Sequence, residues 1–236
     1  MPQVKGILER SGLLGVRRML RRALLRLRRR DQIRRYLEAH SSRRLQLGTG
    51  PNILPGWLNT DLFPQSREIV FIDAARPLPF DDCSFDCVFS EHLIEHLEHH
   101  QGALMLRECF RVLRPGGRIR IATPDLRFLI ELYNPEKSEL QVRYVSWAAR
   151  ELAPDVRAAQ EVFVINNFFR AWGHQFIYDR EALQEAMRGA GFTGMGPCRV
   201  GESGDRNLRG LEAHGRQIPE EFNELETLVL EGTKPA

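Results

Sequence analysis

A series of short apolar segments, each followed by a glycine, a carboxylate or a turn, constrains the fold of this chain more than any other feature. Strands are expected near residues 44–47, 57–61, 69–73, 85–90 and 118–123. These segments are short and nearly continuous in apolar character, as strands buried on both faces of a parallel sheet are. Helical segments alternate with them, which predicts an α/β, doubly wound and mostly parallel sheet with helices on both faces.

Further helices and a closing strand are expected in the rest of the domain. A helix near 102–113 should stop at the Arg-Pro-Gly-Gly turn of residues 114–117, where proline and glycine favour a turn. Asp179 is expected to cap a later helix that runs to about Arg188. The sequence also indicates a helix over 125–133, a less regular and aromatic-rich insertion over 134–175, and a strand over 227–231.

The net charge of +3 conceals a basic arm attached to an acidic domain. Residues 1–44 contain 14 of the 34 lysines and arginines but only three acidic residues. We therefore divide the chain into a basic N-terminal arm, 1–43, and a domain, 44–236, with an insertion at 134–178. Within the arm, residues 13–27 predict an amphipathic helix whose apolar stripe consists of Leu13, Val16, Met19, Leu20, Ala23, Leu24 and Leu27.

Three interpretations of this basic helix remain open. Its apolar stripe either packs on the domain or lies on an anionic membrane surface, which residues 13–35 would contact. Nucleic acid is the weaker alternative, because the arm has no interleaved aromatics and the acidic domain would repel phosphates. The sequence contains no run of 18 uncharged apolar residues, no secretory signal and no CxxC pair. These features predict a cytoplasmic protein, peripheral to the inner membrane face if the helix binds lipid.

Four residues at the predicted strand ends suit a nucleoside-type ligand. In an open α/β sheet a ligand binds beyond the carboxyl ends of the strands. Gly48 and Gly50 lack a Cβ, so the backbone between them can approach a ligand closely. Asp61, at the end of the second strand, can accept hydrogen bonds from a ribose diol. Asp73, at the end of the third, can accept one from an adenine amine beside a backbone N–H group.

The order of these motifs resembles that of the class I S-adenosylmethionine-dependent methyltransferases over about residues 44–133. The resemblance implies a Rossmann-like fold and S-adenosyl-L-methionine as the cofactor. The stretch 48–61, with Ile-Leu-Pro-Gly-Trp at 53–57, is similar to a bacterial branch often associated with surface-polysaccharide synthesis. The implied cofactor-binding residues are Gly48, Thr49, Gly50, Asp61, Leu62, Asp73, Ala74 and Ser90.

Two features depart from the usual methyltransferase pattern. Only 13 positions separate Gly48 from Asp61, so the first helix must be shortened or replaced by a loop, and Gln46 stands where an acid often precedes the glycines. A nicotinamide-binding Rossmann domain is the alternative, but residues 48–53 lack the third glycine of GxGxxG. Prolines 51 and 55 also discourage the helix that should face a pyrophosphate, which S-adenosylmethionine does not contain.

Residues 92–96, His-Leu-Ile-Glu-His, form a second motif. Zinc peptidases have the same H-x-x-E-H pattern, but its place after a strand of a nucleotide-type sheet argues against a peptidase. The segment is similar to the E-x-x-E-H of methyltransferases that act on small-RNA 2′-hydroxyls or quinone precursors and use a divalent ion. This resemblance implies a metal site formed by His92, Glu95, His96 and His174. His99 and His100 are expected to be solvated.

The insertion supplies candidate residues for the methyl acceptor. Residues 166–179 are rich in aromatic and amide side chains, which suit a polar, ring-shaped molecule. His174 is a candidate base, because an imidazole can take a proton from a hydroxyl group near neutral pH. Methyl transfer is an in-line displacement, in which the enzyme aligns the acceptor with the sulfonium. The candidate catalytic residues are His174, His96 and His92.

The sequence thus predicts an S-adenosylmethionine-dependent methyltransferase that acts on a small polar or saccharide acceptor, at oxygen. Two alternatives remain: an RNA methyltransferase, and a non-enzymatic scaffold that docks through its basic arm. Residues 201–226 contain no recognisable chemistry.

Overall fold

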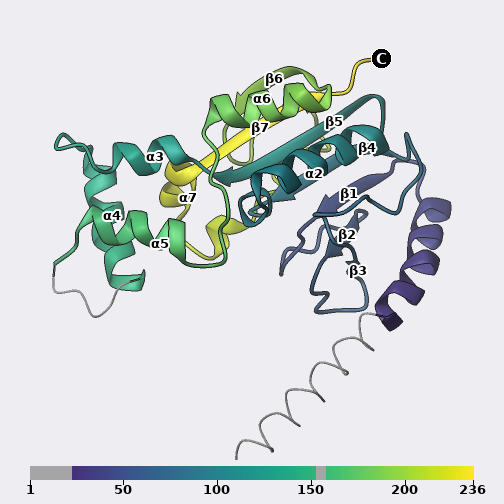
Figure 1. The fold of residues 1–236 in the computed structure, drawn as a ribbon, viewed down its shortest axis with the longest axis horizontal. Coiled ribbons are helices and arrows are strands. Elements are labelled where there is room, and N and C mark those ends of the chain that lie inside the picture. Colours follow the sequence, from purple (N-terminus) through teal and green to yellow (C-terminus); the bar gives the residue numbers. More distant parts are fainter. Residues whose placement is uncertain (1–22, 153–157) are drawn as a thin grey trace, which may run out of the picture.

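The computed structural model describes residues 23–152 and 158–236, and its centre is a seven-stranded sheet with the order β3-β2-β1-β4-β5-β7-β6 (Figure 1). The first five strands pair in parallel, whereas β7 runs antiparallel to both β5 and β6. The predicted α/β, Rossmann-like and mostly parallel sheet is confirmed. The strands are β1 (Arg44–Leu47), β2 (Leu58–Asp61), β3 (Val70–Phe71), β4 (Phe85–Glu91), β5 (Leu113–Pro124), β6 (Thr193–Cys198) and β7 (Thr227–Thr233).

The helices follow the predicted order, with one main difference. The expected irregular insertion contains two helices, because its aromatic side chains recur at helical spacing and pack into a cluster of their own. Asp179 caps its helix as predicted, accepting the N–H of Ala182 at 2.8 Å. After a helix over 23–39, the elements are α2 (His99–Val112), α3 (Leu126–Glu131), α4 (Glu139–Leu152), α5 (Glu161–Arg170), α6 (Arg180–Ala190) and α7 (Glu220–Glu226), with short 3-10 turns η1 (Ile94–His96) and η2 (His214–Arg216).

Strand lengths differ from the prediction in three places. β3 pairs with β2 over only two residues, Val70 and Phe71. β5 begins at Leu113, because that residue pairs with Phe85 ahead of the expected turn. β6 was not predicted, since its sequence, rich in glycine and proline, lacks the apolar character of a strand. Between β1 and β2 the chain forms turns instead of a helix, as the short spacing required.

The two faces of the sheet are covered differently. One face packs against helix 23–39, α2 and α6, whose buried side chains join those of the strands in the main core. On the other face, Cys87 and Phe89 of β4 contact Trp57, Leu208 and Leu211, which belong to irregular segments. The segment between β6 and α7 therefore takes the place of a long covering helix on this face.

Helices α3, α4, α5 and α7 gather beyond one end of β5 and β7, at the left in Figure 1. Each contributes an aromatic ring to a second buried cluster: Phe128, Tyr144, Phe168 and Phe222, respectively. Tyr144 contacts Phe128 and Phe222 edge-on, at ring-centroid distances of 5.0 and 5.4 Å. This cap of four helices places aromatic side chains beside the ends of β4 and β5.

Helix 23–39 meets the domain through only one of its sides. Ile33 and Tyr36 are buried in the main core, and the Tyr36 hydroxyl donates to the carbonyl of Arg44 at 2.9 Å. Leu24 and Leu27 of the predicted apolar stripe are 56% and 75% exposed. These two leucines therefore do not pack on the domain, contrary to the first interpretation of the stripe. Most of the other stripe residues lie outside the described part of the chain. Within the part of the chain that is described, no helix combines the length and apolar character needed to cross a bilayer.

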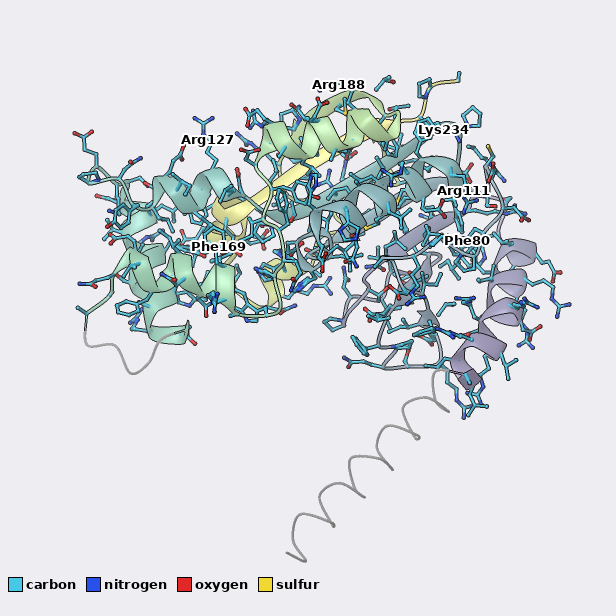
Figure 2. All side chains as sticks on the ribbon, viewed as in Figure 1. Phe80, Arg111, Arg127, Phe169, Arg188 and Lys234 are labelled. Carbon is cyan, nitrogen blue, oxygen red and sulfur yellow. The ribbon has the colours of Figure 1, made fainter. Side chains whose placement is uncertain are left out.

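Arg111 on α2 lies beside Phe80 of the loop before β4 (Figure 2), and Arg111 and Glu108 together fix this loop. Glu108 accepts the N–H of Leu78 at 2.6 Å and is hydrogen-bonded to Arg111, which also donates to the carbonyls of Leu78 and Phe80. The hydrogen bond from Arg111 lowers the pKa of Glu108, against the opposing effect of burial. A carboxyl group whose pKa is lowered in the folded state stabilises the protein at pH values above its ordinary, unfolded-state pKa. This stabilisation is lost as the pH falls through the lowered, folded-state pKa.

Replacing Glu108 with Gln should therefore lower the free energy of unfolding in a pH-dependent way. Loss of the hydrogen bonds to a charged partner is expected to cost about 1.5–3 kcal/mol at neutral pH. The difference in the free energy of unfolding between Glu108→Gln and wild type should have its full size at pH values above the ordinary carboxyl pKa of 4.5. It should shrink as the pH falls below that value. Urea unfolding at several pH values measures it. A difference that stays constant down to acid pH would contradict this account.

Candidate functional site

The two glycines after β1 have different structural reasons to be glycine. Both lie in the left-handed region, with φ of 70° at Gly48 and 50° at Gly50. A Cβ at position 48 would lie 2.9 Å from the Cβ of Leu93, so packing alone excludes a side chain there. A Cβ at position 50 would meet no atom within 4 Å. The free space above Gly50 is therefore available to a ligand.

The two aspartates predicted to bind the cofactor lie at the ends of adjacent strands. Asp61 Oδ2 accepts the N–H of Gly50 at 2.9 Å, and its Oδ1 accepts that of Phe63 at 2.7 Å. Asp73 Oδ1 accepts the N–H of Ala75, while its Oδ2 pairs with Arg76 at 3.1 Å. Each carboxylate oxygen retains a second lone pair for a ligand. The predicted residues Leu62 and Ala74, which directly follow the aspartates, are half-buried and buried.

A cavity of about 280 Å³, called here the cofactor cavity, lies between the glycine loop and the end of β4. The hydroxyl of Thr49, which lines this cavity, is buried without a hydrogen-bond partner. The hydroxyl of the predicted cofactor residue Ser90, near the end of β4, is also buried and unpartnered, but Ser90 does not line the cavity. Unpartnered buried hydroxyls are costly, so that of Thr49 fits a site that binds a polar ligand. The cavity is lined by Gly48, Thr49, Gly50, Pro51, Asn52, Glu91, His92, Ala213, His214, Arg216 and Gln217.

A second cavity of about 300 Å³, called here the acceptor cavity, adjoins the first. The two cavities share His92, His214 and Gln217, so these residues stand at their junction. Four aromatic rings form walls, and no lysine or arginine is among the lining residues that the structure describes. The lining consists of His92, Glu95, His96, Pro124, Tyr144, Trp147, Phe168, Trp172, His174, His214, Gln217, Ile218 and Glu226.

His92 and Glu95 form a buried pair in this wall. His92 Nδ1 lies 3.1 Å from Glu95 Oε1, and Thr123 donates to Glu95 Oε2 at 3.1 Å. Burial alone would lower the pKa of His92, but the hydrogen bond and charge of Glu95 outweigh it and raise this pKa. Burial likewise opposes ionisation of Glu95, yet the bond to His92 holds its pKa below the ordinary value. Both directions favour an imidazolium–carboxylate pair near neutral pH.

His174 lies beside His96, with ring centroids 4.9 Å apart. Its Nδ1 is 2.7 Å from the carbonyl oxygen of Phe168. Because a carbonyl only accepts, Nδ1 carries the proton and Nε2 keeps its lone pair. Burial lowers the pKa of His174, which favours the neutral ring. Ligand atoms of Glu95, His96 and His174 lie within 4.8 Å of one another, so these three residues could hold a metal ion. His92, the fourth residue of the predicted set, contacts Glu95 from outside this group.

The site also contains residues that the sequence did not single out. His214 lies against His92, with ring centroids 4.1 Å apart, and its Nε2 is 3.2 Å from Glu226. Tyr144 donates to the same carboxylate, and burial together with the charge of Glu226 raises the pKa of the Tyr144 phenol. Glu91 accepts the N–H groups of Ala213 and His214. These residues come from distant parts of the chain, and only the adjacency of Glu91 to the 92–96 motif could have suggested one of them.

Other predicted residues lie where the sequence placed them. His99 and His100 are exposed, as expected, although the ring of His99 contacts that of Phe176 at 4.9 Å. Trp172 lies in the left-handed region at φ 55°, directly before Gly173 at φ 82°, and its ring packs 5.5 Å from that of His174. This tight turn brings His174 back toward the ends of β4 and β5.

Comparisons with known proteins agree on the type of domain. Residues 46–121 match a family model described as a methyltransferase domain. A demethylmenaquinone methyltransferase from Clavibacter sepedonicus is 35% identical over 130 residues, which are 53% of this chain and 46% of the relative. One from Protochlamydia amoebophila is 30% identical over 136 residues, or 56% of this chain and 50% of the relative. The chain thus spans about half the length of these curated relatives.

A solved structure also resembles this chain. It is a SAM-dependent methyltransferase and possible histamine N-methyltransferase from Thermotoga maritima, with a TM-score of 0.44 and 20% identity over 84% of this chain and 87% of that one. The sequence relatives above are named for demethylmenaquinone, so they give no support to the predicted link with surface polysaccharides. The family match, together with the sheet order and the glycine loop, identifies residues 46–121 as a class I S-adenosylmethionine-dependent methyltransferase domain.

Proposed function

We propose that this protein transfers a methyl group from S-adenosylmethionine to a hydroxyl-bearing, ring-shaped small molecule. The observation that carries the proposal is the pair of adjoining cavities, one beside the glycine loop and one walled by aromatic rings. The cofactor, when bound, supplies a methyl group on a sulfonium sulfur. The chain's residues would then orient the acceptor at the junction of the cavities and remove its proton.

The acceptor cavity supports a neutral ring more than an anion. Its lining combines Tyr144, Trp147, Phe168 and Trp172 with imidazoles and carboxylates, and it contains no arginine or lysine among the described residues. Flat apolar faces stack on sugar or aromatic rings, and the imidazoles provide hydrogen bonds to hydroxyl groups. A saccharide and a quinol both fit this chemistry. The names of the relatives favour the quinol.

We assign the role of base to His174. Its Nε2 carries the free lone pair, because Nδ1 is bound to the carbonyl of Phe168. A metal ion held by Glu95, His96 and His174 is the competing use of the same lone pair, and it would activate the acceptor oxygen as a Lewis acid. The imidazolium of His92 already balances the charge of Glu95, which disfavours a cation. His92 and His96 then position the acceptor.

The predicted cofactor contact of Gly50 can be tested without disturbing the protein's own packing. In Gly50→Ala the new Cβ meets no protein atom, so affinity for S-adenosylmethionine should fall about 10- to 100-fold through a clash with the cofactor. Gly116→Ala is the matched control, since Gly116 has φ 78° and equally open surroundings far from the cavity. Both variants should lose about 1–2 kcal/mol of stability from backbone strain. Equal affinities in the two variants would contradict the assignment.

The role of His174 predicts a selective loss of turnover. In His174→Ala, the rate with an accepted quinol or saccharide should fall about 100- to 10,000-fold, while affinity for S-adenosylmethionine stays unchanged. His99→Ala, an exposed histidine outside the cavity, is the control. We expect EDTA to leave wild-type turnover intact. If EDTA abolishes it and a divalent ion restores it, His174 is a metal ligand. Nuclear magnetic resonance of the product identifies the methylated atom.

We further propose that helix 23–39 docks on an anionic membrane surface. Leu24 and Leu27 point away from the side that carries Ile33 and Tyr36, and six arginines against two acidic residues surround them within this helix. Exposed leucines flanked by arginines fit the headgroup region of anionic lipids, where each basic residue contributes about 1 kcal/mol. A peripheral position would also suit a lipid-linked acceptor.

Vesicle co-sedimentation tests this surface. Wild type should bind vesicles that contain anionic lipid, and bind those of neutral lipid only weakly. The double variant Leu24→Gln, Leu27→Gln should no longer bind the anionic vesicles, whereas Val142→Gln, at another exposed apolar position, on α4, should still bind them. If the leucine substitutions leave vesicle binding unchanged and the protein also binds RNA, the arginines would be assigned to nucleic acid instead.

A further inference from the structure

The segment 199–217 is anchored to the sheet by a buried arginine, and most of it lies within residues 201–226, for which the sequence predicted no chemistry. Arg120 of β5 is fully buried and donates to the carbonyls of Glu202 at 2.8 Å and Arg199 at 3.1 Å. It also pairs with Glu212, whose other oxygen accepts the N–H of Gly201 at 3.0 Å. Both ends of this loop are thereby held on one guanidinium, and breaking such a buried network is costly.

A second anchor lies at the end of β4, inside the cofactor cavity. Glu91 accepts the N–H of Ala213 at 2.9 and 3.0 Å and that of His214 at 3.0 Å. These bonds use the carboxylate of Glu91 to start η2, the short turn that ends at Arg216. Arg120 holds Glu212 and Glu91 holds Ala213, and these two residues are adjacent in sequence. The backbone that leads to Arg216 is therefore fixed three residues before it.

Arg216 stands in the cofactor cavity without a partner. It is exposed and lines the cavity together with the glycine loop and His92. Its backbone N–H donates to the carbonyl of Ala213 at 3.0 Å, but its guanidinium forms no hydrogen bond or ion pair with any residue within 23–152 or 158–236. Among the described lining residues it is the only lysine or arginine. A guanidinium held at a cavity wall, with no carboxylate to neutralise it, suits an anionic group of the ligand.

We propose that Arg216 binds the carboxylate of the methionyl end of S-adenosylmethionine, an inference that rests on the proposed function. The cofactor has two ends of different chemistry, a nucleoside and an amino acid. Asp61 and Asp73, the residues suited to the nucleoside, follow β2 and β3 and do not line the cavity. The amino-acid end then lies toward β4, where Arg216 is the available cation. The carboxylate of Glu91 accepts the N–H groups of Ala213 and His214 and forms no ion pair with Arg216.

Binding of two cofactor analogues isolates this contact. S-Adenosylhomocysteine contains the carboxylate, whereas decarboxylated S-adenosylhomocysteine keeps the nucleoside, the thioether and the amine. In Arg216→Gln, affinity for the first should fall about tenfold and affinity for the second should not change. Arg216→Lys should restore part of the loss. Arg206→Gln, a change of the same kind on the same segment but outside the cavity, should alter neither affinity.

Each result of these titrations has a distinct meaning. An unchanged affinity of Arg216→Gln for S-adenosylhomocysteine would overturn the proposal, and so would an equal loss for both analogues, which would indicate a reshaped cavity. Thermal unfolding of Arg216→Gln without ligand should match wild type, since the guanidinium of Arg216 forms no hydrogen bond or ion pair with the described residues. If wild type binds neither analogue, the proposed function itself fails, and this inference fails with it.

Discussion

The fully buried carboxylate of Glu95 connects the chain segments that form the site. Its side chain joins His92 and Thr123, while its backbone carbonyl accepts the N–H groups of Gln175 and Phe176. A buried charge of this kind is tolerated only when it is paired and fully hydrogen-bonded. The pairing therefore holds the turn after β4, the end of β5 and the chain that leaves the cap in one arrangement. The two cavities owe their common wall to this arrangement.

The predicted cofactor residues and the two cavities draw on two kinds of chain segment. Gly48, Gly50, Asp61 and Asp73 lie at or just after the ends of parallel strands, at one edge of the sheet. Irregular segments and cap helices, held by Glu91, Arg120 and the aromatic cluster, enclose the other sides. The cofactor cavity therefore has one wall from the sheet edge and one from the irregular segment around η2, while the acceptor cavity is walled mainly by the cap helices and their connections. His92 and His214 stand where the two meet.

Local signals explain what the sequence predicted well. Glycines, aspartates and prolines act on the backbone within a few residues of their own position, so the strand ends, the missing first helix and the cap at Asp179 could be read directly. The 92–96 motif and His174 were brought together by resemblance, and the structure does place them side by side.

Long-range contacts explain what the sequence could not reveal. Glu91 meets Ala213 across more than a hundred residues, and Arg120 is buried only because Glu212 and Glu231 fold back onto it. In the sequence, Arg120 is an ordinary charged residue within a strand. The stripe of helix 23–39 illustrates a related limit. Periodicity identifies its apolar side, but only tertiary packing decides that Ile33 and Tyr36, and not Leu24 and Leu27, face the core.

Isothermal titration of the wild-type protein with S-adenosylmethionine, and separately with NADH, decides which cofactor the domain binds. We expect saturable binding of one equivalent of S-adenosylmethionine, lost in Asp61→Ala, and no binding of NADH. NADH lacks the sulfonium amino acid and contains a pyrophosphate. The chain between β1 and β2 forms turns, so it provides no helix N-terminus to bind that pyrophosphate. Binding of NADH in place of S-adenosylmethionine, or binding of neither, would show that this is not a methyltransferase site.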